Sequence, residues 1–275
     1  IPFILKEVDV QSAVRNGGSI ETAARDLRYK ALREAARGGG YAKIAVAHHG
    51  DDQAETVLYH LLRGSGVTGL SGMKPINGDI IRAFLCVSKN EIKDFLKDFS
   101  YVPCHDESND VEDAVRNRIR LSLVPELISY NPRVTESLRR TADIFREEDL
   151  FMEEKADVFI SSCVEHDNDK CVFFIAYFLA LHIALQRRVI RKICCMVAGR
   201  IPSFEGIEKF IFLIGAGKTG SVTSSSGTFL EIQYGKAIFY KGSTQNRIPA
   251  GKLKNVGTSA AVLSELVKRL IEHLG

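Results

Sequence analysis

The feature that most constrains the fold is a short apolar run that stops at a cluster of polar residues. AKIAVA (42–47) has the composition of a buried strand, and a helical pattern follows from about Asp52 to Arg63. FILKEVDV (3–10) is also rich in β-branched and apolar residues, and it precedes another helix that GGG (38–40) ends. The apolar face of that helix consists of Ala23, Ala24, Leu27 and Ala31. Strands that alternate with helices predict an α/β fold with a parallel, Rossmann-like sheet.

The same alternation continues after residue 80. IIRAFL (80–85) is a strand candidate, and Ser88 and Glu91 have capping-box spacing at the start of a helix that runs to about Phe99. Asn131 followed by Pro132 is typical of a helix start, and the helical pattern then continues to about Ile160. We expect this long helix to lead out of the first domain.

The remaining chain predicts a second, mainly helical domain. Residues 172–198 form an apolar and then basic helical stretch, residues 206–220 form a helix closed by glycines, and TFLEIQYGKAIFYKG (228–242) predicts a small β-hairpin. We therefore expect a catalytic domain at 1–128 and a linker helix with a substrate domain at 129–250. Residues 252–275 contain an amphipathic helix that ends in glycine, which would lead without strain into the strand at 3–10, so we expect it to pack with the first domain.

Composition and charge are compatible with a protein that works on a polyanion. The net charge is only +3, but arginines cluster at 116–120, 133–140 and 186–192, a pattern that fits nucleic acid or simply a solvated surface. The six cysteines include no CxxC pair, so we interpret them as reduced thiols. No apolar run reaches the length of a membrane span and no signal sequence is recognisable, so we expect a cytoplasmic protein without a membrane partner.

The candidate site is the polar cluster after residue 47. Polar residues between the end of a strand and the start of a helix lie where open α/β sheets bind ligands, and the free amides of the helix favour anions there. Asp52, Glu55, Thr56 and Tyr59 recur at three- and four-residue steps and therefore share one face. The two carboxylates suit a Mg²⁺ ion that bridges to phosphates, or the capture of an amine. The alternative is a helix cap with acidic residues in the first turn.

HHGDDQAETVLYHLLRGSGVTGLSGM (48–73) resembles the signature of tRNA(Ile)-lysidine synthases, which are members of the N-type ATP pyrophosphatase superfamily. ETAARDLRYKAL (21–32) is similar to the arginine-bearing helix of that family, and DESNDVEDAVRNRIRLSLVPEL (106–127) to its acidic loop and RNxIR segment. NPRVTESLRRTADIFREE (131–148) resembles its linker helix, and ALQRRVIRK (184–192) a helix of its substrate domain.

The resemblance implies a ligase that uses ATP and Mg²⁺ to activate the wobble cytidine of the isoleucine tRNA with a CAU anticodon. The side-chain amine of L-lysine then displaces AMP and forms lysidine. Adenylation is chemically sensible because AMP leaves more readily than a carbonyl oxygen. The resemblance leaves open whether the protein is a homodimer.

The resemblance also implies roles for individual residues. Asp52 and Glu55 would hold lysine and Mg²⁺, His49 would line the same turn, and Arg28 would meet an ATP phosphate or the lysine carboxylate. Nucleotide binding falls to Asp51, Arg116, Asn117 and Arg120, and tRNA or substrate binding to Asp106, Asn109, Arg187, Arg188 and Arg191. Bland alternatives are a solvated helix face for Arg28, a structural salt-bridge cluster for the residues between 106 and 120, and surface solubility for the arginines of 187–191.

The sequence also departs from the family pattern. The SGGxDS loop and the HxxHGLR stretch do not occur in these 275 residues, and Ala83 replaces the usual proline after the strand arginine. Either this sequence omits the first strand and its loops, or ATP activation has been lost, and we favour omission. GAGKTG (215–220) does not have the GxxxxGK[ST] spacing of a phosphate loop and no predicted strand leads into it.

Two other functions remain open. A metal-dependent phosphohydrolase would use the paired histidines and aspartates as ligands, but the other histidines show no ligand spacing. A non-catalytic tRNA-binding remnant would be consistent with the absent loop.

Overall fold

We analysed a computed structural model of the 275-residue chain, which describes residues 3–10, 20–101, 115–167 and 169–242. The chain divides into two compact units, Ile1–Glu148 and Asp149–Gly275. The boundary falls within the long helix α8 (Val134–Cys163), whereas the sequence-based division places all of this helix in the second part. The helix expected in 252–275 lies outside the described residues.

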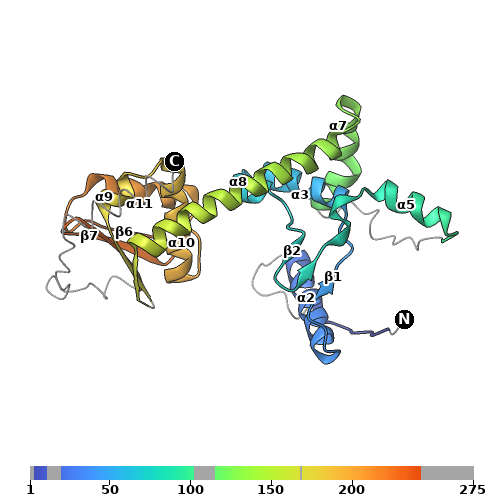
Figure 1. The fold of residues 1–275 in the computed structure, drawn as a ribbon, viewed down its shortest axis with the longest axis horizontal. Coiled ribbons are helices and arrows are strands. Elements are labelled where there is room, and N and C mark those ends of the chain that lie inside the picture. Colours follow the sequence, from blue (N-terminus) through green and yellow to red (C-terminus); the bar gives the residue numbers. More distant parts are fainter. Residues whose placement is uncertain (1–2, 11–19, 102–114, 168, 243–275) are drawn as a thin grey trace. The chain divides into compact units, whose positions relative to one another are not determined.

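The first unit contains a small mixed sheet with helices around it (Figure 1). Strand β1 (Ile44–Ala45) pairs in parallel with β3 (Ile80–Ile81), and β2 (Ile76–Asn77) pairs with β3 in the antiparallel direction. Helix α2 (Ile20–Gly38) precedes β1, and α3 (Gly50–Leu62) follows it. The expected α/β fold is therefore confirmed.

Shorter elements complete this unit. The chain continues after α3 through α4 (Val67–Leu70), and after β3 through a 3-10 turn (Ala83–Cys86) and α5 (Lys89–Asp98). A single helical run then consists of α6 (Val115–Arg118), a π-helical turn (Ile119–Leu123) and α7 (Val124–Tyr130).

The strand expected at 3–10 is absent from the structure. Residues 3–9 have no regular secondary structure, and Phe3, Ile4 and Leu5 are 85%, 63% and 74% exposed. A strand needs a neighbour to complete its hydrogen bonds, and the described sheet pairs only β1, β3 and β2. A strand-forming composition is therefore not sufficient to make residues 3–9 a strand, because the described sheet offers them no pairing partner.

The strand expected at 80–85 is also shorter than predicted. Only Ile80 and Ile81 are in the sheet, because their antiparallel partner begins at Ile76, which lies opposite Ile81. The chain then leaves the sheet and forms the 3-10 turn.

Several helix boundaries follow the predicted chemistry. Ser88 and Glu91 form the expected capping box at the start of α5. Helix α8 begins at Val134, shortly after Asn131 and Pro132, and the Asn131 side chain accepts a hydrogen bond from the Arg133 amide at 3.0 Å. The local sequence therefore specifies these ends well.

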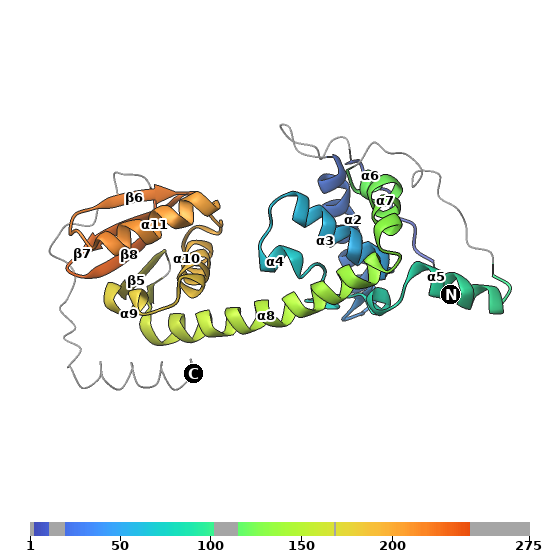
Figure 2. The same cartoon turned by 90° about the horizontal axis from the view of Figure 1, so that it is seen from above.

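The second unit contains a five-stranded antiparallel sheet with order β4-β5-β8-β7-β6. Its strands are β4 (Glu165–Asp167), β5 (Lys170–Phe174), β6 (Val222–Ser225), β7 (Thr228–Gln233) and β8 (Lys236–Lys241). Helices α9 (Ile175–Leu179), α10 (Ile183–Ala198) and α11 (Phe204–Ala216) pack with this sheet (Figure 2).

The predicted hairpin at 228–242 is confirmed, and it lies within this larger sheet. Tyr234 and Gly235 both have positive φ angles, 47° and 74°, as a two-residue type I′ turn requires. The continuous helix expected at 172–198 is wrong at its start. Residues 172–174 belong to β5, because β8 offers them a pairing partner, and α9 ends before α10 begins.

Aromatic side chains form the core of the second unit. Phe159, Phe173, Phe178, Phe210 and Phe239 are almost completely buried. The Phe239 ring stacks on Phe173 with centroids 5.9 Å apart and meets Phe210 edge-on at 5.4 Å. This cluster joins α8 and α9 to the sheet and α11.

The described cysteines Cys86, Cys163, Cys171, Cys194 and Cys195 are free thiols, as expected, whereas Cys104 lies outside the described residues. Burial raises the pKa of Cys171 to about 11 and that of Cys194 to about 12, so both remain protonated at neutral pH. Among the helices that the structure describes, none combines the length and apolar character needed to cross a membrane.

We predict that Phe239→Ala destabilises the second unit by about 3–5 kcal/mol, because it leaves a cavity between Phe173 and Phe210. Native-state hydrogen exchange of the β7 and β8 amides would measure the loss. Phe212→Ala on α11 is the matched control, because Phe212 is 78% exposed. We expect a change within about 0.5 kcal/mol for the control, and equal effects of the two substitutions would contradict the assigned core.

Candidate active site

The turn after β1 is fixed by a capping box at the start of α3. His49 is the N-cap residue, and its Nδ1 accepts a hydrogen bond from the Asp52 amide at 3.4 Å. In return, Asp52 Oδ2 accepts a hydrogen bond from the His49 amide at 2.9 Å. Both residues therefore have a structural role, which was the alternative reading of their positions.

Glu55 and Asp52 share one face of α3, as predicted, and both face Arg120. Glu55 is only 3% exposed and accepts two hydrogen bonds from the Arg120 guanidinium, at 2.7 and 2.9 Å. Asp52 Oδ1 accepts a third from Arg120 Nη2 at 3.1 Å. Glu55, Asp52 and Asp51 raise the pKa of Arg120, with the hydrogen bonds to Glu55 contributing most.

Arg116 extends this cluster by one turn of α6. Its Nη2 donates to Thr56 Oγ1 at 3.3 Å and to the Asp52 carbonyl at 3.4 Å. Its Nε lies 3.4 Å from Glu55 Oε2, which is close enough for electrostatic attraction, but Nε has no hydrogen-bond partner within the described segments. Thr56 also donates to the Asp52 carbonyl at 2.7 Å. We call Asp52, Glu55, Arg116 and Arg120 the carboxylate–arginine cluster.

A widened helical turn carries Arg120 into this cluster. Residues Ile119–Leu123 are π-helical, and the Val124 amide reaches back to the Ile119 carbonyl. Pro125 follows directly, has no amide hydrogen, and in a regular α-helix would collide with the carbonyl four residues earlier. A wider turn before Pro125 relieves this conflict, and such turns are frequent at functional sites.

The cluster does not fit the Mg²⁺ ion predicted at Asp52 and Glu55. Their carboxylate oxygens face Arg120, Arg116 and the His49 amide, and two guanidinium groups balance their charge. Over the described parts of the chain, no group of three or more histidines, cysteines or acidic residues has the geometry to hold a metal ion.

Asp51 points to a different neighbourhood from Asp52. Asp51 Oδ2 accepts a hydrogen bond from the Lys89 amide at 2.7 Å and lines a cavity of about 660 Å³ between the starts of α3, α5 and α8. Arg139 from α8 reaches the same place and donates to the Cys86 carbonyl at 2.6 Å. A Cβ atom on Gly50 would lie only 2.6 Å from the Arg139 side chain, so a larger residue there would force this side chain to shift.

We did not predict an individual role for Arg139 from the sequence. It belongs to a basic cluster at 133–140 that indicated only a polyanion surface. Gly50 in the HHGDD motif indicates that another group can approach the backbone closely, but the sequence does not show that this group is Arg139.

Arg28 lies near His48. Both line a cavity of about 260 Å³ between α2 and the end of β1. Burial lowers the pKa of His48 to about 4, and the nearby charges of Arg82, Arg116 and Arg25 act in the same direction, although Asp52 opposes them. His48 Nδ1 is buried and has no hydrogen-bond partner among the described residues. His48 is therefore neutral at pH 7.

The other predicted residues fall into three groups. Asp106 and Asn109 lie outside the described residues, and Asn117 lies on α6 beside the cluster. Arg187 is on the surface of α10 and pairs with Glu208 at 2.7 Å. Arg191 is on the same helix, in the following turn.

The prediction that Arg188 contacts tRNA is corrected by the structure. It is 8% exposed, and its Nη1 lies 2.6 Å from both Asp149 and Glu153. These ion pairs hold α10 against α8. Because Arg188 is buried and paired, it does not present its charge to an RNA phosphate.

Residues 1–127 match the PP-loop domain family. The chain is 36% identical to the tRNA(Ile)-lysidine synthase of Caldanaerobacter subterraneus subsp. tengcongensis over 74% of this chain and 44% of that protein. The Thermotoga maritima protein of the same name is 32% identical over 88% of this chain and 57% of its own length.

Residues 1–127 belong to the PP-loop domain family.

A third relative extends the resemblance beyond the PP-loop domain. The tRNA(Ile)-lysidine synthase of Solibacter usitatus is 29% identical over 98% of this chain and 62% of its own length. The resemblance that the sequence indicated is therefore confirmed, and neither the phosphohydrolase nor the remnant is favoured. The chain spans about half the length of the curated relatives it matches.

We predict that Arg120→Met destabilises the PP-loop domain by about 3 kcal/mol, because it leaves the Glu55 carboxylate buried without its bidentate partner. Hydrogen exchange of the α3 amides would measure this loss. Arg187→Met is a matched control, since Arg187 Nε also lies 2.7 Å from a glutamate oxygen but the pair is exposed. Its substitution should cost less than about 1 kcal/mol, measured at the α10 amides. Equal costs would show that burial does not govern the cluster.

We predict that His48 makes the chain less stable in mild acid. The unfolded chain binds a proton on His48 below pH 6.5, whereas the folded chain resists protonation until about pH 4. Stability from this residue is therefore fully present above about pH 6.5 and falls as the pH drops through this window. Urea unfolding followed by circular dichroism at several pH values would show a weaker pH dependence in His48→Gln. The exposed His166→Gln control should keep the wild-type profile.

Proposed function

We propose that this chain carries the catalytic part of a tRNA(Ile)-lysidine synthase. In this reaction ATP adenylates the wobble cytidine of tRNA(Ile), and the lysine amine then displaces AMP. The observation that carries the proposal is the convergence of two motifs about 65 positions apart, HHGDDQAET and RNRIR, in one carboxylate–arginine cluster. The matches to the PP-loop domain and to proteins named tRNA(Ile)-lysidine synthase support it.

The two carboxylates of the cluster are not equivalent, which suggests separate roles. The Glu55 side chain is 4% exposed and binds Arg120 through two hydrogen bonds, so we assign Glu55 to anchoring the arginines. The Asp52 side chain is 12% exposed and makes one longer contact with Arg120. We assign Asp52 to binding the lysine amine. In the structure, Arg120 Nη2 occupies the place beside Asp52 Oδ1 that the cationic amine would take.

The arginines complete this assignment. Once an amine pairs with Asp52, Arg116 and Arg120 remain fixed by Glu55 and can turn their other donors toward phosphate oxygens of ATP. Arg28 would act from the His48 cavity on the same nucleotide or on the lysine carboxylate. Holding amine and adenylate together is the main contribution that such a site can make to the rate.

The wider setting follows from the same proposal. The partners are ATP, L-lysine and the tRNA(Ile) with a CAU anticodon, with the cytoplasm as the place of action. Any Mg²⁺ would accompany the ATP phosphates, since the cluster itself does not suit a metal ion.

The test is transfer of radiolabelled lysine to isoleucine tRNA in the presence of ATP. We expect label in the tRNA, and we expect Asp52→Asn to reduce transfer by about 10²-fold or more, because the amine loses its charged partner. Thermal unfolding and tRNA binding of this variant should stay close to wild type. Asp94→Asn is the control, because Asp94 is an exposed aspartate on α5 that pairs with its neighbour Lys97.

Other outcomes would overturn the proposal. Phosphate release without tRNA would indicate a phosphohydrolase, and tRNA binding without product would indicate a remnant. Transfer that Asp52→Asn leaves intact would remove Asp52 from the site.

A further inference from the structure

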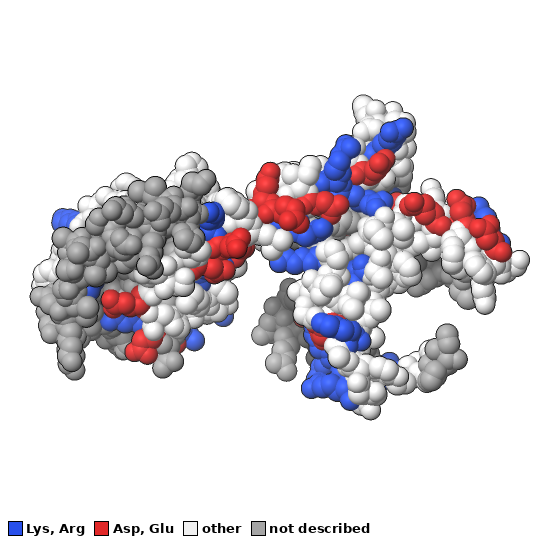
Figure 3. All heavy atoms as spheres, in the orientation of Figure 1, with Lys and Arg blue, Asp and Glu red and all other residues white. Residues whose placement is uncertain are grey.

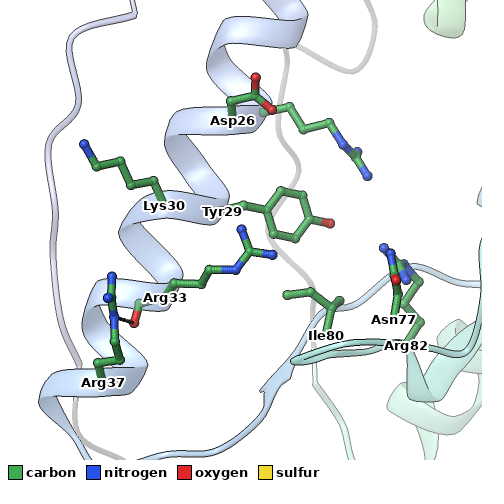
Figure 4. A pocket seen from close by; sticks show the side chains of 9 residues that line it. Asp26, Tyr29, Lys30, Arg33, Arg37, Asn77, Ile80 and Arg82 are labelled. Carbon is green, nitrogen blue, oxygen red and sulfur yellow. Dashed lines mark hydrogen bonds between the residues drawn. The ribbon is translucent and has the colours of Figure 1, made fainter. Parts of the chain in front are cut away.

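A polar cavity of about 460 Å³ lies between α2 and the β2–β3 hairpin, and it shares Arg25 and Tyr29 with the His48 cavity. Figure 4 shows Lys30, Arg33 and Arg37 projecting from successive turns of α2, and Asn77 and Arg82 on the hairpin side. We call this the α2–hairpin pocket. The proposed function assigns no role to it.

The pocket is strongly basic. Five cationic side chains line it, together with one carboxylate, that of Asp26. Arg33 also makes a two-pronged ion pair with Asp79, at 2.7 and 3.2 Å, which ties α2 to the hairpin. Figure 3 shows lysine and arginine side chains gathered over α2 in the first unit. A concave surface with this charge attracts anions.

An aromatic ring lies between the cations. The Tyr29 ring, which points into the pocket in Figure 4, has the guanidinium carbon of Arg25 5.1 Å from its centroid and that of Arg33 5.9 Å away. These contacts hold both guanidinium groups in place before any ligand binds. Basic residues interleaved with an aromatic ring are typical of surfaces that bind nucleic acid.

Arg82 contributes a buried cation to the pocket. It lines the pocket, is only 7% exposed, and donates through Nη1 to the Lys74 carbonyl at 2.9 Å. Its Nε is buried and has no hydrogen-bond partner among the residues that the structure describes. A guanidinium is always charged, so the buried Arg82 adds a fixed positive charge to the wall of the pocket.

We propose that the α2–hairpin pocket binds the phosphate backbone of RNA. The proposal rests on the function above, in which tRNA is the substrate, and gives that tRNA a contact on the first unit. The basic row runs from Arg25 to Arg37, about 18 Å along the helix axis. A row of this length suits several consecutive phosphates better than the single triphosphate of a nucleotide. Lys30 and Arg37 in this row are exposed and therefore also accessible to a large partner.

The test is the salt dependence of tRNA binding by the whole chain. Lys30→Gln combined with Arg37→Gln should weaken binding of isoleucine tRNA about tenfold at moderate salt. The slope of log affinity against log salt should fall by about two, one for each phosphate that is no longer neutralised. The matched control is Lys93→Gln combined with Lys97→Gln on α5, which removes the same charge from another exposed helix. The control should change the slope by less than half as much.

Three results would overturn the proposal. The first is that the wild-type chain does not bind tRNA, and the second is that the two double variants have equal salt slopes. The third is that ATP alone displaces tRNA from the wild-type chain and that this displacement depends on Lys30 and Arg37. Lysine transfer measured on the same wild-type preparation separates this proposal from the proposed function. If lysine is transferred but the two double variants have equal slopes, only the RNA-binding role of the pocket is rejected. If the slope falls for Lys30→Gln with Arg37→Gln but no lysine is transferred, only the proposed ligase function is rejected. Thermal unfolding of both variants should match wild type, because all four side chains are exposed.

Discussion

The bidentate pair between Glu55 and Arg120 is the interaction on which the first unit depends. Burying a carboxylate is unfavourable unless a partner satisfies both of its oxygens, and Arg120 does so at 2.7 and 2.9 Å. The pair joins α3 to the helical run that contains α6, although the two segments are separated by the whole β2–β3 hairpin and α5. Arg116 and Asp52 extend it, so the turn after β1 is held both by its own cap and by two arginines.

Features determined by neighbouring residues could be predicted from the sequence. The capping box of Ser88 and Glu91 needs only residues three positions apart, and the turn at Tyr234 and Gly235 needs a residue pair that tolerates positive φ. The shared face of Asp52 and Glu55 follows from helix geometry alone. The domain family was also accessible, because HHGDDQAET is a contiguous and specific pattern.

Features that depend on a distant partner could not be predicted. Residues 3–9 and residues 172–174 have similar strand-forming composition, yet only the latter are in a sheet, because β8 pairs with them. The sequence also could not show which arginines would form buried ion pairs. Nothing in QRRVIRK distinguishes Arg188, which is buried against Asp149 and Glu153, from Arg187, which is exposed beside Glu208. The sequence also could not show that arginines would meet the carboxylate oxygens of Asp52 and Glu55, where we expected a metal ion.

Pairing therefore decides which arginines remain available to a ligand. In the second unit Arg188 is neutralised by two carboxylates, and in the carboxylate–arginine cluster two guanidiniums meet two carboxylates. Along the α2–hairpin pocket the cations are in excess, since five of them line a cavity with the carboxylate of Asp26, and Arg33 also pairs with the carboxylate of Asp79 beside it. Unbalanced charge is unfavourable to the free protein through mutual repulsion, and binding of an anion relieves this repulsion. The imbalance at α2 therefore argues for a ligand more strongly than the larger number of arginines elsewhere in the chain.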